Sequence, residues 1–384
     1  MSINFATLQG LTIPEGVVTQ IADATGRVLW SAEEILEGTL MVKKITHDTY
    51  AGETTYAGEQ FILLDIYPRT NGTVNVTYGD FTKTVTDTSG AVEPNAIQVF
   101  FGTFNGVSDS VATPASGALF IEGDCRGVGC GTYRAEDSKG TVSDTKYTGV
   151  TSVNDLGNME MLPASAFSNC NELTIANISG TILEIPSNAF SGCSSLKNVV
   201  IGNGVDWIRD GAFSGCISLT NVSIPASVGN IGVELMSFAG YTAFPSNIPN
   251  PLKIDSKNTM YKIDGNCLIG DGIDLKQGFS NSEIPNYIEE ISEHAFYGCS
   301  GLLGEITIPA TVTRIYEGAF YGCSGLTEII VQPTKPPIFG NGLNDVSDVF
   351  DGTTASIIVP AGCGDTYKAT AGWSEYADRI VEAS

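Results

Sequence analysis

The sequence predicts a mostly β protein, in which an N-terminal immunoglobulin-like β-sandwich precedes a solenoid of short strands and short helical or 3₁₀ turns with a C-terminal cap. The first observation behind this fold class is an Ala-Phe-x-Gly-Cys or Ala-Phe-x-Asn-Cys segment that occurs five times. Its phenylalanines lie 23 residues apart in the first three copies and 24 apart in the last two: Phe167, Phe190, Phe213, Phe296 and Phe320. A fixed period of this size indicates repeats that bury their apolar sides only by stacking. Short alternating strand patterns before the repeats, and 44 glycines with only 16% charged residues, favour a turn-rich β protein.

Length and charge limit the classes of partner. The chain of 384 residues is long enough for two or three domains, and its hydrophobic content of 42% is too high for a disordered protein. A formal net charge of −24 repels phosphate backbones and anionic lipid headgroups, so we expect neither nucleic acid nor a membrane surface as a partner. No run of about 18 apolar residues occurs, so we expect no membrane insertion.

Residues 1–32 form a short lead. Val18–Ala22 and Gly26–Trp30 flank the turn residues Asp23–Thr25, which predicts a hairpin. The stretch Leu8–Trp30 resembles the openings of phage tail and fibre proteins, in which such leads join a subunit to the particle. The resemblance implies that the lead binds other virion subunits. The alternative is that the lead is only an extra hairpin at the edge of a sheet. Since the opening has neither a basic nor an apolar signal region, we do not expect export under its own signal.

Residues 33–148 carry the strand patterns of the predicted sandwich. Gln60–Tyr67 and Thr73–Tyr78 flank Asn71-Gly72, which predicts a hairpin between them. Three more strand patterns follow at Phe81–Thr86, Ile97–Phe101 and Ala118–Glu122. Short strands at such spacing, without a helical period, are typical of an immunoglobulin-like sandwich, although they do not define its topology. The polar stretch Ala135–Tyr147 predicts a domain boundary near residue 148.

Residues 149–332 form the predicted solenoid. One coil has apolar residues at Leu196, Val199, Ile201, Val205, Ile208, Phe213 and Cys216, and the next repeats them up to Ile231 and a displaced Phe238. Leu-x-x-Val-x-Ile predicts a short strand with its apolar side on the core. The following Ile-Pro ends that strand, because proline cannot donate to a ladder. The Ala-Phe segment predicts a tight turn of helical or 3₁₀ kind.

This pattern resembles the BspA-like leucine-rich repeats of bacterial surface proteins, phages and some protists, over about half of the chain. Between Phe238 and Phe296 the repeat is interrupted, and residues 258–269 are similar to the longer hairpin-bearing unit of that family. Residues 333–384 resemble its C-terminal cap, with a last strand at Ile357–Pro360 and a short helix at Tyr367–Ile380. A cap is physically required, since an open last coil exposes strand edges and apolar side chains.

Nine cysteines occur, and five share one repeat position: Cys170, Cys193, Cys216, Cys299 and Cys323. A side chain that recurs at one position of each coil points the same way each time, so we expect these five thiols to be buried as small apolar groups. A disulfide framework is the alternative, but this chain is no small secreted scaffold. Cys125 and Cys130 lie close together in glycine-rich sequence, and whether they pair stays open.

Side chains for catalysis or metal binding are scarce. The two histidines, His47 and His294, lie far apart in the sequence, and we expect His294 at a solvated turn. Asp345, Asp348 and Asp351 cluster in sequence but match no calcium-loop spacing. The glycine-rich residues 123–131 lack the Gly-Lys-Ser/Thr of a phosphate-binding loop. We therefore expect no catalytic residue, no cofactor and no metal site.

The remaining candidate site is the outer face of the repeat strands. Residues between the apolar positions point away from the core and together form a polar surface on a rigid frame. The candidate binding residues are Lys197, Asn198, Thr220, Asn221, Ser223, Glu305, Thr307, Thr327 and Glu328. A merely solvated sheet face is the alternative.

These features predict a non-enzymatic recognition or adhesion protein whose ligand is a host surface protein or glycan. Together with the phage-like opening, they predict a virion appendage, either a tail fibre or a receptor-binding subunit, located in the phage particle. A homo-oligomer is then an option, since fibres are often trimers. One alternative is a bacterial surface adhesin with BspA-like repeats. A second is a polysaccharide-degrading enzyme that uses a pair of carboxylates on the sandwich.

Overall fold

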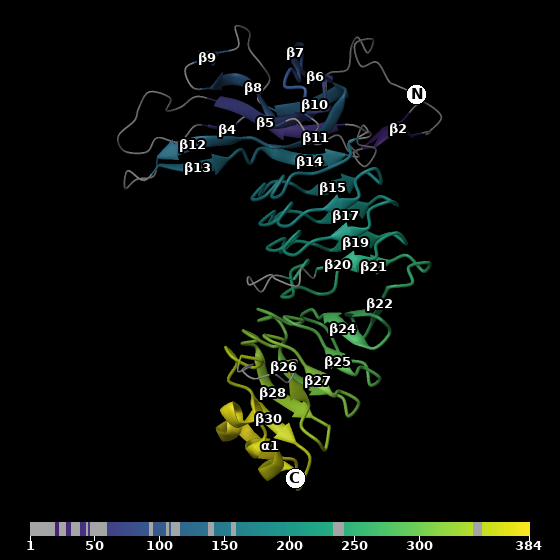
Figure 1. Ribbon diagram of the computed structural model, residues 1–384, viewed down its shortest axis with the longest axis vertical. Coiled ribbons are helices and arrows are strands. Elements are labelled where there is room, and N and C mark those ends of the chain that lie inside the picture. Colours follow the sequence, from purple (N-terminus) through teal and green to yellow (C-terminus); the bar gives the residue numbers. More distant parts are fainter. Residues whose placement is uncertain are drawn as a thin grey trace.

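The molecule is long and mostly β, with N-terminal sheets at one end, stacked coils along its long axis and the C-terminal helical segments at the other end (Figure 1). The computed structural model describes residues 20–22, 28–31, 39–43, 45–46, 60–91, 95–104, 107–108, 116–136, 142–154, 159–232, 242–340 and 348–384. The predicted mostly β fold with a solenoid of stacked coils is confirmed. The immunoglobulin-like character of the N-terminal part stays a prediction, as does the division of the chain into four segments.

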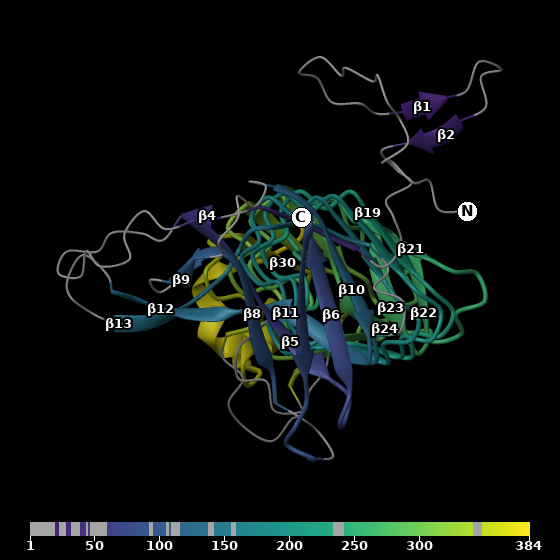
Figure 2. The ribbon, with the colours of Figure 1, turned by 90° about the horizontal axis from the view of Figure 1, so that it is seen from above.

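The hairpin predicted in the lead is present. β1 (Gln20–Ala22) pairs antiparallel with β2 (Val28–Ser31), and Figure 2 shows both strands to one side of the molecule. Most of residues 1–32 lie outside the described residues, and the likeness of the lead to phage proteins stays a prediction.

Two sheets form the N-terminal part. One has the order β11-β5-β8-β9, with β4 paired to β5. Its strands are β4 (Ile45–Thr46), β5 (Gln60–Pro68), β8 (Ile97–Phe104), β9 (Val107–Ser108) and β11 (Cys125–Cys130). The other begins with β7 (Phe81–Thr86), β6 (Thr73–Tyr78), β10 (Ser116–Gly123) and β3 (Thr39–Lys43). The three strand patterns expected after residue 80 are therefore present.

The hairpin predicted at Asn71-Gly72 is wrong. β5 and β6 belong to different sheets, so this turn connects the two sheets instead of two paired strands. The backbone N–H of Asn71 donates to the Asp87 carboxylate at 2.8 Å, and a Cβ at Gly72 would lie 2.6 Å from the Cβ of Asp124. These contacts with distant residues fix the corner. The hairpin in this region is β6–β7, closed at Tyr78 and Phe81.

Hydrogen bonding continues from the N-terminal part into the coils. β14 (Val150–Asn154) pairs antiparallel with β3 on one side and parallel with β15 (Ile175–Ile178) on the other. The result is a nine-stranded sheet that crosses residue 148, with the order β21-β19-β17-β15-β14-β3-β10-β6-β7. One hydrophobic core, from Leu40 to Phe279, lies under it. The polar stretch expected as a linker forms a hairpin of β12 (Thr132–Glu136) and β13 (Val142–Lys146).

Each coil contributes one long and one short parallel strand. The long strands continue the nine-stranded sheet with β17 (Asn198–Ile201), β19 (Asn221–Ile224) and β21 (Leu252–Ile254). The short strands are β16 (Glu184–Ile185), β18 (Trp207–Ile208) and β20 (Asn230–Ile231), which form a separate sheet. Every apolar position predicted for the coil from Leu196 to Cys216 is buried. At about 25 cal/mol per Å² of apolar surface removed from water, this burial stabilises the stack.

Phenylalanine rings form a ladder along the axis of the coils. Phe167, Phe190, Phe213 and Phe244 stack with centroid separations of 5.4, 5.3 and 5.4 Å. The sequence suggests Phe238 as the next member of this row, but the position belongs to Phe244 and Phe238 lies outside the described residues. A second ladder contains Phe296, Phe320 and Phe350.

The hairpin-bearing unit interrupts the long-strand sheet. It contains β22 (Tyr261–Asp264), β23 (Cys267–Gly270) and β24 (Asp274–Gln277), which pair antiparallel. β24 then pairs parallel with β25 (Glu290–Ile291), followed by β27 (Arg314–Ile315) and β29 (Ile338–Phe339). Long strands resume in a separate sheet of β26 (Gly304–Ile308), β28 (Leu326–Val331), β30 (Ser356–Val359) and β31 (Ile380–Glu382). A second core, from Cys267 to Ile380, lies under this part.

The C-terminal cap differs from the prediction in two respects. The single helix expected at 367–380 is two segments, α1 (Gly364–Ala369) and the 3₁₀ helix η2 (Trp373–Arg379), separated at Gly372 with a φ of 79°. The last strand is β31, which pairs with β30 beyond the strand expected at Ile357–Pro360. Trp373 is buried and its Nε1 donates to the carbonyl of Pro337 at 2.7 Å, so the helices cover the last coil. No helix among the described residues is long and apolar enough to cross a membrane.

Candidate functional site

The nine predicted binding residues all lie on outward positions of long-strand coils, and each is exposed or half-buried. The structure places them on two sheets, which corrects the expectation of one stacked face. Lys197, Asn198, Thr220, Asn221 and Ser223 belong to the coils of β17 and β19, and Glu305, Thr307, Thr327 and Glu328 to those of β26 and β28. The break follows from the hairpin-bearing unit, because β21 pairs only with β19. We call these nine residues the repeat-sheet face.

Parallel register brings equivalent side chains of the repeat-sheet face side by side. Asn198 pairs with Asn221, and Ser223 pairs with Lys253 of β21. Lys253 is exposed and extends the face, as does half-buried Asn177 of β15, which pairs with Val200. Sequence reasoning missed both residues. The first coil has Ala176 where later coils have valine, and the β21 coil keeps only the end of the Leu-x-x-Val-x-Ile pattern.

The two halves of the repeat-sheet face differ in charge. Lys197 and Lys253 are exposed on the first half. On the second half Glu305 pairs directly with Glu328, so two carboxylates lie on neighbouring strands. Strands in a sheet lie about 4.8 Å apart. Like charges at this separation repel one another, so this pair favours a cationic or hydrogen-donating partner.

Two of the predicted threonines already have a structural role. The hydroxyl of Thr220 donates to the carbonyl of Lys197 at 3.3 Å, and that of Thr327 donates to the carbonyl of Gly304 at 3.0 Å. Each bond joins one coil to the preceding coil. Their oxygens retain acceptor capacity, so these two residues can accept hydrogen bonds from a ligand.

The repeated cysteines are buried free thiols, as predicted, and Cys125 and Cys130 do not pair. Cys130 instead lies with its Sγ 3.6 Å from the Sγ of Cys170. Burial raises the pKa of Cys125 to about 11 and that of Cys299 to about 12, so these thiols stay protonated at neutral pH. None of these groups is available as a nucleophile.

The aspartates of residues 345–351 have structural roles where they are described. Asp348 accepts a hydrogen bond from the backbone of Gly318 at 3.2 Å, and Asp351 accepts one from the Tyr376 hydroxyl at 3.1 Å. Asp345 and His47 lie outside the described residues. The described part of the chain holds no group of three or more His, Cys, Asp or Glu arranged to bind a metal ion.

His294 is not at a solvated turn as expected. It occupies the turn position before Ala-Phe with a φ of 56°, but its side chain is only 17% exposed. The ring packs edge-on against Tyr297 at 5.1 Å, and its Nδ1 lies 3.5 Å from the Glu293 carboxylate. The equivalent residues of the other coils, such as Ser165 and Asn188, also have a positive φ, so this conformation belongs to the repeat.

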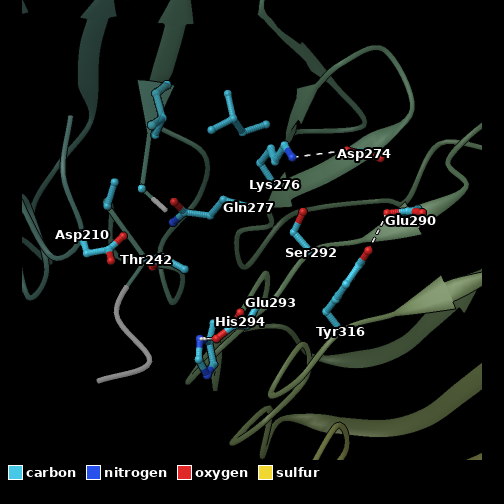
Figure 3. A pocket seen from close by; sticks show the side chains of 14 residues that line it. Asp210, Thr242, Asp274, Lys276, Gln277, Glu290, Ser292, Glu293, His294 and Tyr316 are labelled. Carbon is cyan, nitrogen blue, oxygen red and sulfur yellow. Dashed lines mark hydrogen bonds and ion pairs between the residues drawn. The ribbon is translucent and has the colours of Figure 1, made fainter. Parts of the chain in front are cut away.

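We call the coils up to β21 the first stack, and the hairpin-bearing unit with the coils that follow it the second stack. His294 lines a pocket of about 260 Å³ at the break between the two stacks (Figure 3). The walls come from two coils at the end of the first stack, from the hairpin-bearing unit and from the first coils of the second stack. They are Asp210, Ile231, Gly232, Thr242, Ala243, Leu268, Asp274, Lys276, Gln277, Glu290, Ser292, Glu293, His294 and Tyr316. Sequence analysis did not find this site, since its residues come from separate coils and share no motif.

Several polar groups of the pocket are paired with one another. Lys276 lies 3.2 Å from the Asp274 carboxylate, and the Tyr316 hydroxyl donates to Glu290 at 3.0 Å. Burial and the nearby carboxylates of Glu317, Asp210 and Asp348 raise the pKa of Glu293, while His294 lowers it. Among the described lining residues, four carboxylates against one lysine give the pocket an excess of negative charge.

Comparison with known proteins identifies the repeat. A family model described as the BspA type leucine-rich repeat region matches residues 146–267 and 274–342, with six copies. No curated protein matches the chain.

Several solved structures are similar to this chain at low identity. The crystal structure of the pneumococcal vaccine antigen PcpA matches with 13% identity over 65% of this chain and 82% of the other, at a TM-score of 0.37. A leucine-rich repeat protein from Eubacterium ventriosum matches with 19% identity over 56% and 66%, at a TM-score of 0.31. One from Bacteroides ovatus matches with 20% identity over 66% and 74%, at a TM-score of 0.28.

Proposed function

The repeat region of this chain belongs to the BspA-type leucine-rich repeat family, and we propose that the protein is a non-enzymatic recognition protein whose repeat-sheet face binds a surface protein or glycan. The observation that carries the proposal is the in-register pairing of outward polar side chains on parallel strands, such as Asn198 with Asn221. Strands about 4.8 Å apart repeat the same hydrogen-bonding groups at a fixed spacing, which suits an extended or repetitive ligand.

The composition of the repeat-sheet face favours hydrogen bonding over apolar contact. Asparagine, serine and threonine dominate it, and these short side chains lose little rotamer entropy when a ligand orders them. The backbone beneath them is already fixed by strand pairing and by the two hydrophobic cores. Such a preorganised surface avoids part of the ordering cost that binding otherwise carries.

As to location, we propose a phage virion appendage, a tail fibre or receptor-binding subunit, attached to other virion subunits through the lead. The sequence likeness of Leu8–Trp30 to phage openings supports this location. A bacterial surface adhesin is the alternative that the repeat family favours. Antibody to this chain should label purified particles if the virion proposal holds, and labelling of intact bacterial cells alone would contradict it. Light scattering on the purified chain tests whether it forms the homo-oligomer typical of fibres.

The repeat-sheet face is tested by host-cell adherence of a combined variant, Lys197→Ala, Asn221→Ala, Ser223→Ala and Glu305→Ala. We expect adherence to fall at least about tenfold with an unchanged circular dichroism spectrum, because several ligand contacts are lost together. A matched control, Glu289→Ala with Lys335→Ala, removes the same charges from exposed positions outside the face. Adherence that survives in the first variant, or that falls equally in the control, would reject this face.

Partial variants separate the two halves of the face. One carries the three substitutions at 197, 221 and 223, and the other carries Glu305→Ala with Glu328→Ala. Loss confined to one variant assigns the ligand to that half. The enzyme alternative is tested on the same host glycans: release of reducing ends that a single aspartate or glutamate substitution abolishes would overturn the non-enzymatic proposal.

A further inference from the structure

The pocket between the two stacks is a second site, and we propose that it binds a small hydroxylated ligand with a protonated amine, of the size of an amino sugar. This site lies apart from the repeat-sheet face, and none of the nine face residues lines it. The inference therefore does not depend on the proposed function of that face.

The pocket exists because two sheets end there. β20 is the last strand of the sheet β16-β18-β20, and the six-stranded sheet from β22 to β29 is not hydrogen-bonded to it. The hydroxyl of Tyr261 accepts from the backbone of Ile231 at 3.0 Å and helps to join the two parts. The pocket has a volume of about 260 Å³. One water molecule occupies about 30 Å³ in the liquid, so the pocket has room for several waters or for one monosaccharide.

The charge of the lining selects against anions. Among the described residues that line the pocket there are four carboxylates, those of Asp210, Asp274, Glu290 and Glu293, against one lysine, Lys276, and no arginine. Lys276 pairs with Asp274, Glu290 accepts from Tyr316, and the Glu293 carboxylate lies 3.5 Å from Nδ1 of His294. A phosphate or carboxylate in this pocket is repelled, whereas a protonated amine is stabilised.

Gln277 gives the pocket a hydrogen-bond acceptor. Gln277 is only 2% exposed and extends from β24 toward Asp210 and Thr242 (Figure 3). Its Nε2 donates to the carbonyl of Phe244 at 2.7 Å, while no hydrogen bond within the described part of the chain ends on its Oε1. This oxygen can therefore accept a hydrogen bond from a ligand hydroxyl.

The rest of the lining matches a sugar ring. The Ser292 hydroxyl lines the pocket and can either donate to or accept from a ligand hydroxyl. Ile231, Ala243 and Leu268 give the wall an apolar part, which suits the C–H face of a pyranose. The lining thus combines an anionic subsite for an amine, acceptors for hydroxyl groups and an apolar surface for the ring.

The experiment uses the full chain and glucosamine as the probe, with saturation-transfer difference NMR and calorimetry. Glucosamine should bind at least about tenfold more tightly than N-acetylglucosamine, which lacks the charge, or glucosamine 6-phosphate, which adds an anion. Equal binding of the three sugars, or no glucosamine binding at tens of millimolar, would overturn the proposal.

Variants locate the site. Glu293→Gln keeps the shape of the side chain, and we expect it to weaken glucosamine binding at least about tenfold. Glu305→Gln on the repeat-sheet face removes the same charge elsewhere and should leave binding unchanged. Equal binding by the Glu293→Gln variant would contradict the assignment to this pocket. The combined variant of the repeat-sheet face should still bind glucosamine, so failure of either proposal is distinguishable from failure of the other.

Discussion

The repeated cysteine has two physical roles in each coil. Its side chain is fully buried, and in three coils its thiol donates at 3.1 Å to the carbonyl of the phenylalanine in the preceding coil. These pairs are Cys193 with Phe167, Cys216 with Phe190 and Cys323 with Phe296. That carbonyl also accepts from the backbone N–H of the cysteine in its own coil, so the thiol is its second donor, while the sulfur fills space as a small apolar group. The recurrence of cysteine at one repeat position predicts that its side chain is buried. The sequence does not predict the thiol hydrogen bond, which depends on how each coil is shifted relative to the preceding one.

Thiol reactivity should separate one cysteine from the other eight. Eight cysteines are buried, whereas Cys363 is partly exposed. Burial raises the pKa of Cys125 to about 11 and of Cys267 to about 12, so the reactive thiolate is scarce at pH 8. Treatment of the native protein with iodoacetamide at that pH should add one label, at Cys363, by mass spectrometry. The guanidinium-denatured control should add nine, and two or more labels on the native chain would contradict the prediction.

At the scale of the element, two residues with positive φ enclose each Ala-Phe segment. The one before alanine is Ser165, Asn188, Gly211, His294 or Gly318, and the one before cysteine is Asn169, Gly192, Gly215, Gly298 or Gly322. Side chains other than glycine and asparagine rarely adopt this conformation, which explains the recurring glycines. Within each stack, the glycine before cysteine also contacts the same position of the preceding coil.

A pair of glycine substitutions tests that contact. Gly298 has a φ of 66° and begins its stack, so a Cβ there would meet no atom of the described residues within 4 Å. Gly352 has a similar φ of 72°, but its Cβ would lie 3.0 Å from the Cα of Gly322. Gly298→Asn should change the free energy of unfolding by less than about 1 kcal/mol, and Gly352→Asn should cost about 1–3 kcal/mol more through overpacking. Urea denaturation measures both, and equal losses would contradict a role for stacking.

The secondary-structure elements could be predicted from the sequence where neighbouring residues alone determine the local conformation. The coil pattern is locally complete, so its strands, turns and apolar positions could be predicted. Asn71-Gly72 on its own is a strong hairpin signal. However, the preceding strand β5 is buried at every residue from Phe61 to Leu64 and lies in the middle of a different sheet from β6. Tertiary pairing therefore overrides the turn signal. The cap helix is divided for a local reason, since Gly372 adopts a φ of 79° between α1 and η2.

At the scale of the whole molecule, sheet continuity decides what the sequence could not show. The N-terminal strands and the first coils share one sheet and one core, so the N-terminal part covers the first coil as the C-terminal helices cover the last. The nine face residues could be predicted as outward-facing from the repeat pattern alone. The repeat pattern does not predict that these residues divide over two sheets, or that a pocket lies between the sheets. Both features arise where the hairpin-bearing unit replaces an ordinary coil.

The division into two cores predicts that the two stacks can open separately. Neighbouring coils stabilise one another in a solenoid, so a weak junction between coils limits how far unfolding spreads. Among the described residues, one segment, 267–279, contributes to both cores, with Leu268 and Phe279 in the first and Cys267 and Ile269 in the second. The loss of a stacked phenylalanine should therefore act mainly within its own stack.

Hydrogen exchange with mass spectrometry on two matched variants tests this expectation. Phe190→Ala and Phe320→Ala each remove a fully buried ring from the middle of a ladder, and each should cost about 3–5 kcal/mol. Amides of β15 and β17 should exchange at least about 100-fold faster in the first variant, while those of β28 and β30 keep their rates. The second variant should give the reverse pattern. Equal acceleration of both regions by either substitution would mean that the whole solenoid unfolds as one unit, since opening of either core would then expose the other.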